Sequence, residues 1–137
     1  MIALGCAHGG FDLMQEIMTH LEKRGIAYQN FAKRKPAAFK AFCTAQKAWL
    51  PDYALFMSLK DAHGGKAWDE WEPKLRLCQR ETVAVARKTY SAEIEFWKFV
   101  QFCFFTQWES LKQYANQKGI RIIGDIPIYA AYDSTEV

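Results

Sequence analysis

Residues 119–137, GIRIIGDIPIYAAYDSTEV, decide how the rest of the sequence is interpreted. Isoleucine recurs at odd and even positions of this stretch, at Ile120, Ile122, Ile123, Ile126 and Ile128. Such continuous β-branched character predicts a strand that is covered on both faces, as in a parallel sheet. Parallel strands need crossover connections to their neighbours, and the sequence offers no second strand of this kind. We therefore expect a piece of a larger protein, whose terminal strand is irregular or pairs with another copy.

Size and charge narrow the class of protein. The sequence has 137 residues and a formal net charge of +3, which suit one domain with a single core. Its basic residues are scattered, and the longest cluster, Lys33-Arg34-Lys35, is too short for a nucleic-acid footprint. The most apolar window, residues 96–108, contains Lys98 and is too short to span a bilayer. We expect neither a nucleic acid nor a membrane as a partner.

The cysteines favour a reducing compartment, and the spacing of the histidines gives no sign of a bound metal. The four cysteines stand far apart in apolar surroundings without a C-x-x-C pair, at Cys6, Cys43, Cys78 and Cys103. Reduced thiols are the expected state, which fits the cytosol. The three histidines have no ligand spacing, and the stretch MIALGCAHGG lacks the basic and apolar regions of a signal peptide. We therefore predict a cytoplasmic protein without a metal or another cofactor.

Helical periodicity dominates the sequence before residue 119. Apolar spacings of three and four predict a helix over residues 11–24. Pro36 and Pro51 mark the starts of two further helices, one over residues 36–48 and one that ends at Gly64-Gly65. Around Trp68 and Trp71, Pro73 limits the chain to a short turn of helix and a loop. Residues 1–10 are small and glycine-rich, so we expect a loose end there.

One long helix is predicted over residues 81–117, which contain neither proline nor glycine. Apolar side chains recur along it at helical steps, from Tyr90, Ile94 and Trp97 to Trp108 and Leu111. Between residues 96 and 105 these side chains cover nearly the whole circumference. A helix of that kind is expected to be buried on several sides.

Two motifs carry a resemblance to a known family, and they occur in the order in which that family has them. The first is the run Gly124-Asp125-Ile126-Pro127-Ile128-Tyr129 followed by Asp133-Ser134-Thr135-Glu136-Val137. The second is W-L-x-D-Y-A-L-F from Trp49 to Phe56, with Trp68-x-x-Trp71-x-Pro73 after it. This sequence resembles the amylomaltases, or disproportionating enzymes, the 4-α-glucanotransferases of glycoside hydrolase family 77 in the α-amylase clan. The resemblance covers residues 39–137, and the alanine at position 130 stands where the family usually has valine.

The resemblance implies a fold class and a domain organisation. The protein is expected to be mainly α, a helical insertion subdomain of a (β/α)8 TIM-barrel enzyme plus one terminal barrel strand, with the full barrel outside this sequence. Residues 1–10 would form a loose N-terminal segment and residues 11–118 the helical insertion subdomain. Residues 119–137 would form the barrel strand and the start of the loop after it.

The resemblance also implies a reaction. Amylomaltases cleave an α-1,4 bond in a maltooligosaccharide, hold the glucan covalently and pass it to another glucan, which requires two carboxylates about 5 Å apart. In the clan these carboxylates come from later barrel strands, so no residue of this sequence is assigned as catalytic. Asp125 matches the aspartate of the clan's first conserved region and is expected to bind substrate beside the scissile bond.

Other residues have plainer interpretations. We interpret Asp133 and Ser134 as a turn or helix cap, Trp68 and Trp71 as inter-helix contacts in preference to sugar-stacking platforms, and His63 as a solvated residue at a helix end. The alternative for the whole sequence is a self-standing helical interaction module, in which the apolar stripes grip a partner helix and the terminal segment is a docking tail. An unpaired apolar strand would in either case favour self-association.

Overall fold

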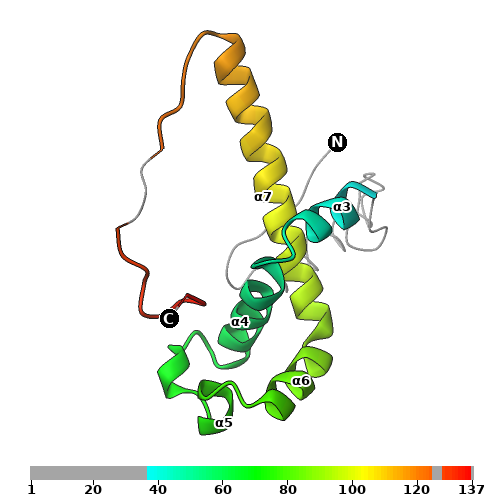
Figure 1. The fold of residues 1–137 in the computed structure, drawn as a ribbon, viewed down its shortest axis with the longest axis vertical. Helices are drawn as coiled ribbons and strands as arrows, with labels where there is room; N and C mark the ends of the chain where they lie inside the picture. Colours follow the sequence, from blue (N-terminus) through cyan, green and yellow to red (C-terminus); the bar gives the residue numbers. More distant parts are fainter. Residues whose placement is uncertain (1–36, 125–127, 137) are drawn as a thin grey trace, which may run out of the picture.

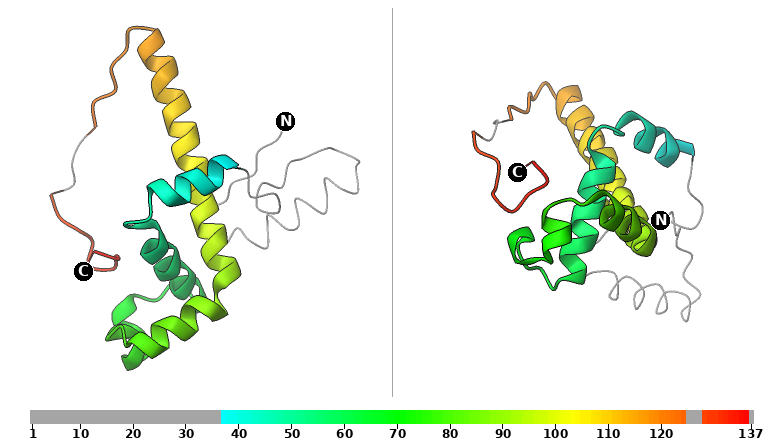
Figure 2. Two further views of the ribbon diagram at one scale, coloured as in Figure 1. Left: turned by 45° about the vertical axis from the view of Figure 1, so that its right-hand side comes forward. Right: turned by 60° about the horizontal axis from the view of Figure 1, so that its bottom comes forward.

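The computed structural model describes residues 37–124 and 128–136 (Figure 1). The segment expected over residues 1–10 and the helix expected over residues 11–24 lie outside these ranges, as does Asp125. The elements within them are α3 (Ala37–Ala45), α4 (Leu50–Ala62), the 3-10 turn η1 (Trp68–Glu70), α5 (Pro73–Arg76), α6 (Arg80–Thr89) and α7 (Ser91–Gln117). Figures 1 and 2 show α7 as the longest element, with α3 and α4 beside its first half and residues 120–124 leaving its far end. The described chain is therefore mainly helical, as expected.

The core lies between α4 and the first half of α7. Ala54 of α4 has no exposed surface, and Ile94 and Trp97 of α7 pack in the same cluster with 6% and 3% of their surface exposed. The Trp97 Nε1–H donates a hydrogen bond of 2.9 Å to Asp61 Oδ2, which satisfies the one polar atom of the indole. Ser58, also buried, donates to the Ala54 carbonyl oxygen at 2.7 Å. Both helices thus bury apolar surface without leaving these polar atoms unpaired.

Aromatic rings fix α3 against α7. Phe39 has only 3% of its surface exposed and meets Phe99 edge to face, with ring centroids 5.8 Å apart. Phe102 lies 5.6 Å from Phe39 and 5.7 Å from Phe42 in similar geometry. Edge-to-face contacts of this kind add to the burial of apolar area. The high aromatic content of the sequence is therefore used largely for packing between helices.

The prediction of one long helix over residues 81–117 is wrong in one respect. The segment forms two helices, α6 and α7, which are separated at Tyr90. The Tyr90 backbone has φ −97° and ψ 28°, outside the helical region, although no proline or glycine is present. The break lets α6 reach the start of α4, where Arg87 donates to the Pro51 carbonyl oxygen at 3.2 Å and pairs with Asp52. Tertiary contacts, including the packing of Tyr90 against the core, outweigh the uninterrupted helical propensity of the segment.

The expected burial of α7 on several sides holds only for its first half. Of its residues, Ile94, Trp97 and Phe99 are buried. Beyond them, Phe104 is 58%, Trp108 37% and Leu111 53% exposed. The apolar stripe seen in the sequence is continuous, but the described chain covers only part of it.

The barrel strand expected after residue 119 is not seen, and the residues that the structure describes contain no strand. Gly119, at φ 75°, ends α7, and residues 120–124 follow without regular secondary structure. Ile120 and Ile123 are 58% and 92% exposed. The segment therefore has the irregular conformation expected of an apolar strand without neighbouring strands. None of the described helices has both the length and the apolar character needed to cross a membrane.

The closed packing around Ala54 gives a stability test. Ala54→Val adds two methyl groups where no space is left, so the free energy of unfolding should fall by about 1–3 kcal/mol. Ala84→Val is the matched control, because Ala84 is exposed in α6. This substitution should cost only the lower helix propensity of valine, about 0.7 kcal/mol or less. Urea unfolding followed by circular dichroism measures both. Equal losses in the two variants would contradict the core as described.

Candidate functional site

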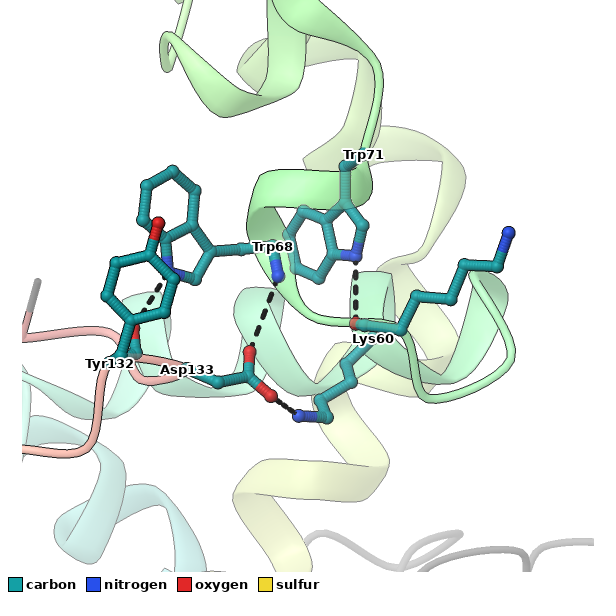
Figure 3. A network of polar contacts seen from close by, with 6 residues as sticks. Lys60, Trp68, Trp71, Tyr132 and Asp133 are labelled. Atoms are coloured by element: carbon teal, nitrogen blue, oxygen red, sulfur yellow. Dashed lines mark hydrogen bonds and ion pairs between the residues drawn. The ribbon is translucent and has the colours of Figure 1, made fainter.

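A polar and aromatic corner joins the C-terminal segment to the helical core. Lys60, in the last turn of α4, and Trp68, the first residue of η1, meet Tyr132 and Asp133 of the segment after α7 (Figure 3). We call these four residues the docking corner. The partners lie 64 to 73 residues apart in the sequence, so the corner closes most of the described chain into one loop.

Three polar contacts define its geometry. The Asp133 Oδ2 atom pairs with Lys60 Nζ, and Asp133 Oδ1 accepts a hydrogen bond of 3.4 Å from the backbone N–H of Trp68. The Trp68 Nε1–H donates to the carbonyl oxygen of Tyr132 at 2.8 Å. The rings of Trp68 and Tyr132 also contact each other, with centroids 5.3 Å apart and planes tilted by 39°. Asp133 and Tyr132 therefore bind the same short turn through charge, hydrogen bonds and ring contact.

The local sequence explains why Trp68 is presented there. Gly64 and Gly65 adopt φ values of 66° and 81°, which end α4 and turn the chain toward η1. Trp71 anchors η1, since it is 6% exposed and its Nε1–H donates to the Lys66 carbonyl oxygen at 3.1 Å. His63 stacks on Trp71 at 5.1 Å between ring centroids. The turn that carries Trp68 is thus fixed to the core.

These contacts decide among the plainer sequence interpretations. Trp71 packs against Phe56 of α4 at 5.4 Å, which confirms the inter-helix role expected of it. His63 lies at the C-terminal end of α4, as expected, but it is partly buried against Trp71 and not fully solvated. Trp68 contacts the C-terminal segment, which sequence spacing did not indicate.

Asp133 and Ser134 were expected to be a turn or a helix cap; the turn is present, and no described helix begins at either residue. Ser134 Oγ accepts a hydrogen bond of 3.4 Å from the Glu136 N–H, which makes a local turn. Asp133 accepts from the N–H of the first residue of η1, as an N-cap does, but from a distant part of the chain. The partner Lys60 was not predicted, because two residues 73 positions apart share no local pattern.

The electrostatics of the corner keep Asp133 ionised. The hydrogen bond from Lys60 lowers the pKa of the Asp133 carboxyl below its ordinary value, against partial desolvation, with smaller help from the Lys60 charge and the Trp68 N–H. Elsewhere, burial raises the pKa of Tyr53, whose hydroxyl accepts from Gln101 Nε2 at 3.0 Å. Across the described ranges, no three His, Cys, Asp or Glu side chains converge as metal ligands would. The corner is built for binding between chain segments.

Asp125, the expected substrate-binding residue, lies outside the described residues. It precedes Asp133 by eight positions, so the docking corner is close to it along the chain. Gly124, which precedes this gap, and Ile128 and Tyr129, which follow it, are exposed. The geometry of Asp125 stays a prediction.

Comparisons with known proteins agree with the motifs. The sequence profile of the 4-alpha-glucanotransferases of glycoside hydrolase family 77 matches residues 11–137. The 4-alpha-glucanotransferase of Clostridium butyricum is 42% identical over 111 residues, which is 81% of this chain and 23% of that protein. The 4-alpha-glucanotransferase of Thermus thermophilus is 48% identical over 100 residues, which is 73% of this chain and 20% of that protein.

A solved structure matches the fold as well. The amylomaltase from Streptococcus agalactiae in complex with acarbose aligns with 93% of this chain and 24% of its own, at a TM-score of 0.71 and 34% identity. Helical fold and motif together define a glycoside hydrolase sequence. The chain belongs to the 4-alpha-glucanotransferase family, glycoside hydrolase family 77. It spans about a fifth to a quarter of the length of these relatives.

The lowered pKa of Asp133 gives a pH test of the corner. Because its folded pKa is below the unfolded value of about 3.9, the Lys60 contact is complete above that pH and is lost as the pH falls through the folded pKa. The indole N–H signal of Trp68 in ¹H–¹⁵N spectra, assigned with Trp68→Phe, should move in that acid range. The Trp71 indole, which donates to the carbonyl oxygen of Lys66 and not to the C-terminal segment, is the internal control and should stay in place. Joint movement of both signals would indicate general unfolding and contradict a local release.

Proposed function

We propose that this chain is part of a 4-α-glucanotransferase that transfers α-1,4-glucan segments between maltooligosaccharides. The observation that carries the proposal is the match of 93% of the chain to an amylomaltase whose structure holds acarbose. The family reaction retains anomeric configuration through a covalent glucosyl-enzyme, formed by a nucleophilic carboxylate and an acid/base carboxylate about 5 Å apart. The comparisons give no support to the alternative of a self-standing interaction module.

We place both catalytic carboxylates outside this chain. Asp133 Oδ2 accepts a hydrogen bond from Lys60 Nζ and Oδ1 accepts one from the Trp68 N–H, so both carboxylate oxygens are already engaged. Asp61 accepts from the Trp97 indole, and Asp52 pairs with Arg87. These three carboxylates serve the fold of the helical unit. The role of the chain is to form and brace one wall of the glucan cleft.

The exposed apolar surface supports a barrel neighbour in the parent enzyme. Phe104 and Leu111 of α7 and Ile120 and Ile123 after it are each more than half exposed, on consecutive elements of the chain. We propose that residues 11–118 form the helical insertion subdomain and that residues 119–137 add a strand and loop start to a (β/α)8 barrel, where this surface is covered. Without that cover, the same surface favours self-association. We also propose a cytoplasmic location for the enzyme, from the scattered cysteines.

Asp125 is the residue that we propose to bind substrate. The position follows a run of apolar residues and precedes Pro127, as expected at the end of a barrel strand where (β/α)8 active sites gather. A carboxylate there can accept hydrogen bonds from the hydroxyl groups of the sugar beside the scissile bond. A residue of this kind orients the sugar and leaves the covalent step to the two catalytic carboxylates.

The activity can be tested with maltotriose. The full-length protein should convert maltotriose to glucose and longer maltooligosaccharides, while the number of reducing ends stays constant, because transfer makes one glycosidic bond for each that it breaks. Chromatography of the products and a reducing-end assay measure both quantities. The 137-residue chain by itself is the control and should be inactive. A rise in reducing ends without longer products would identify a hydrolase and contradict the proposal.

Asp125→Asn tests the substrate-binding role in the same protein. The variant keeps the size of the side chain but loses its charge, so kcat/KM for maltotriose should fall by roughly 10–100-fold, the range for a lost hydrogen bond to a charged group. Glu81→Gln changes an exposed carboxylate of α6, outside the α4–η1 corner, and should leave kcat/KM unchanged. An Asp125→Asn enzyme with the activity of the unmodified protein would remove Asp125 from the site.

A further inference from the structure

The C-terminal segment is fastened to the rest of the described chain at two places. At its start, Ile120 N–H donates to the Ala115 carbonyl oxygen of α7 at 3.0 Å. At its end, Tyr132 and Asp133 bind the docking corner. Between residues 121 and 131, the described residues make no hydrogen bond or ion pair with one another or with the helices. The docking corner therefore determines where the segment returns to the helical unit.

The corner is suited to hold its partner in one orientation. The side chains of Lys60 and Asp133 are 17% and 30% exposed, so the ion pair is partly shielded from water. Both carboxylate oxygens of Asp133 have separate partners, which fixes the rotation of the carboxyl group as well as its position. The adjacent Tyr132 adds a main-chain hydrogen bond and a ring contact to the same tryptophan. Two consecutive residues thus make four contacts with two others.

The other described ion pairs do not have this arrangement. Arg87 and Asp52 join α6 to α4, but Asp52 is 70% exposed. Lys98 and Glu95 lie three residues apart within α7. Among the described pairs, Lys60–Asp133 alone links a helix of the core to the segment after α7. Breaking the Lys60–Asp133 pair should therefore change the position of that segment, whereas breaking the Arg87–Asp52 pair should leave it in place.

We propose that Lys60 and Asp133 are positioning residues of the transferase, which fasten the loop after the GDIPIY motif to the α4–η1 corner so that both meet the glucan as one rigid wall. This inference rests on the proposed function, and it assigns the two residues no contact with the reacting atoms. When the pair is broken, the loop gains freedom that substrate binding must remove. The cost appears as weaker binding, while the catalytic carboxylates outside this chain keep their chemistry.

The test uses the full-length enzyme and five variants. Asp133→Asn and Lys60→Met each break the pair, and the double variant breaks it once, so all three should raise KM for maltotriose by the same factor, roughly two- to fivefold as for a partly exposed ion pair. Their kcat should stay within about twofold of the unmodified enzyme. Lys60→Arg keeps the positive charge, so its KM should stay close to that of the unmodified enzyme. Asp52→Asn is the matched control, because it removes an ion pair that does not touch the segment, and its KM should be unchanged.

A second measurement separates positioning from a loss of stability. The Trp68 indole N–H signal of the 137-residue chain should shift in Asp133→Asn and not in Asp52→Asn, whereas the Trp71 signal should stay in place in both. Unchanged KM in Asp133→Asn and Lys60→Met, with an active unmodified enzyme, would overturn the positioning role alone. Additive effects in the double variant would also overturn it, since they would show that the residues act separately. An unmodified enzyme without disproportionation would instead overturn the proposed function.

Discussion

The packing of α4 against the first half of α7 is the contact on which the rest of the described structure depends. Ala54 is small enough for the two helices to approach closely, and Trp97 closes the interface with its single polar atom bonded to Asp61. From this pair, α3 is held through Phe39 and α6 through the break at Tyr90. The turn η1 is held through Trp71, which contacts Phe56 of α4. Each peripheral element is therefore placed by a large side chain that reaches the same two helices.

The sequence predicted most of the helical elements because their ends carry local chemical signals. Pro51 and Gly64-Gly65 marked α4 to within a residue or two, and Pro73 marked the break between η1 and α5. The break at Tyr90 had no such signal, since the backbone there is bent by contacts of Tyr90 and Arg87 with distant residues. The docking corner was missed for the same reason, because Lys60 and Asp133 are brought together only by the completed fold. Of the candidate site, the sequence predicted Asp125 only through the family motif, and Asp125 lies outside the described residues.

The two halves of α7 differ in what covers them. The first half belongs to the core of this chain, with Ile94, Trp97 and Phe99 buried. The second half exposes Phe104, Trp108 and Leu111 in the same helical register, and the apolar segment after Gly119 is exposed too. A chain that spans a fifth to a quarter of its relatives is expected to show surface that its parent covers. Helical periodicity predicts which face of α7 is apolar, and it does not say which part of that face this chain covers.

The length of α7 has a mechanical consequence. Its 27 residues extend roughly 40 Å at 1.5 Å per residue, and other helices pack against its first half, as far as the contact of Phe42 with Phe105. The second half, roughly 20 Å long, projects beyond these contacts, so a tilt of α7 by about 5° displaces its tip by roughly 2 Å. Residue 119 lies at that tip, and residues 120–124 lead away from it (Figure 1). A small change in the packing around Ala54 that tilts α7 therefore moves the far end of this helix. Substitutions in the core can in this way change the position of residues that are distant from them.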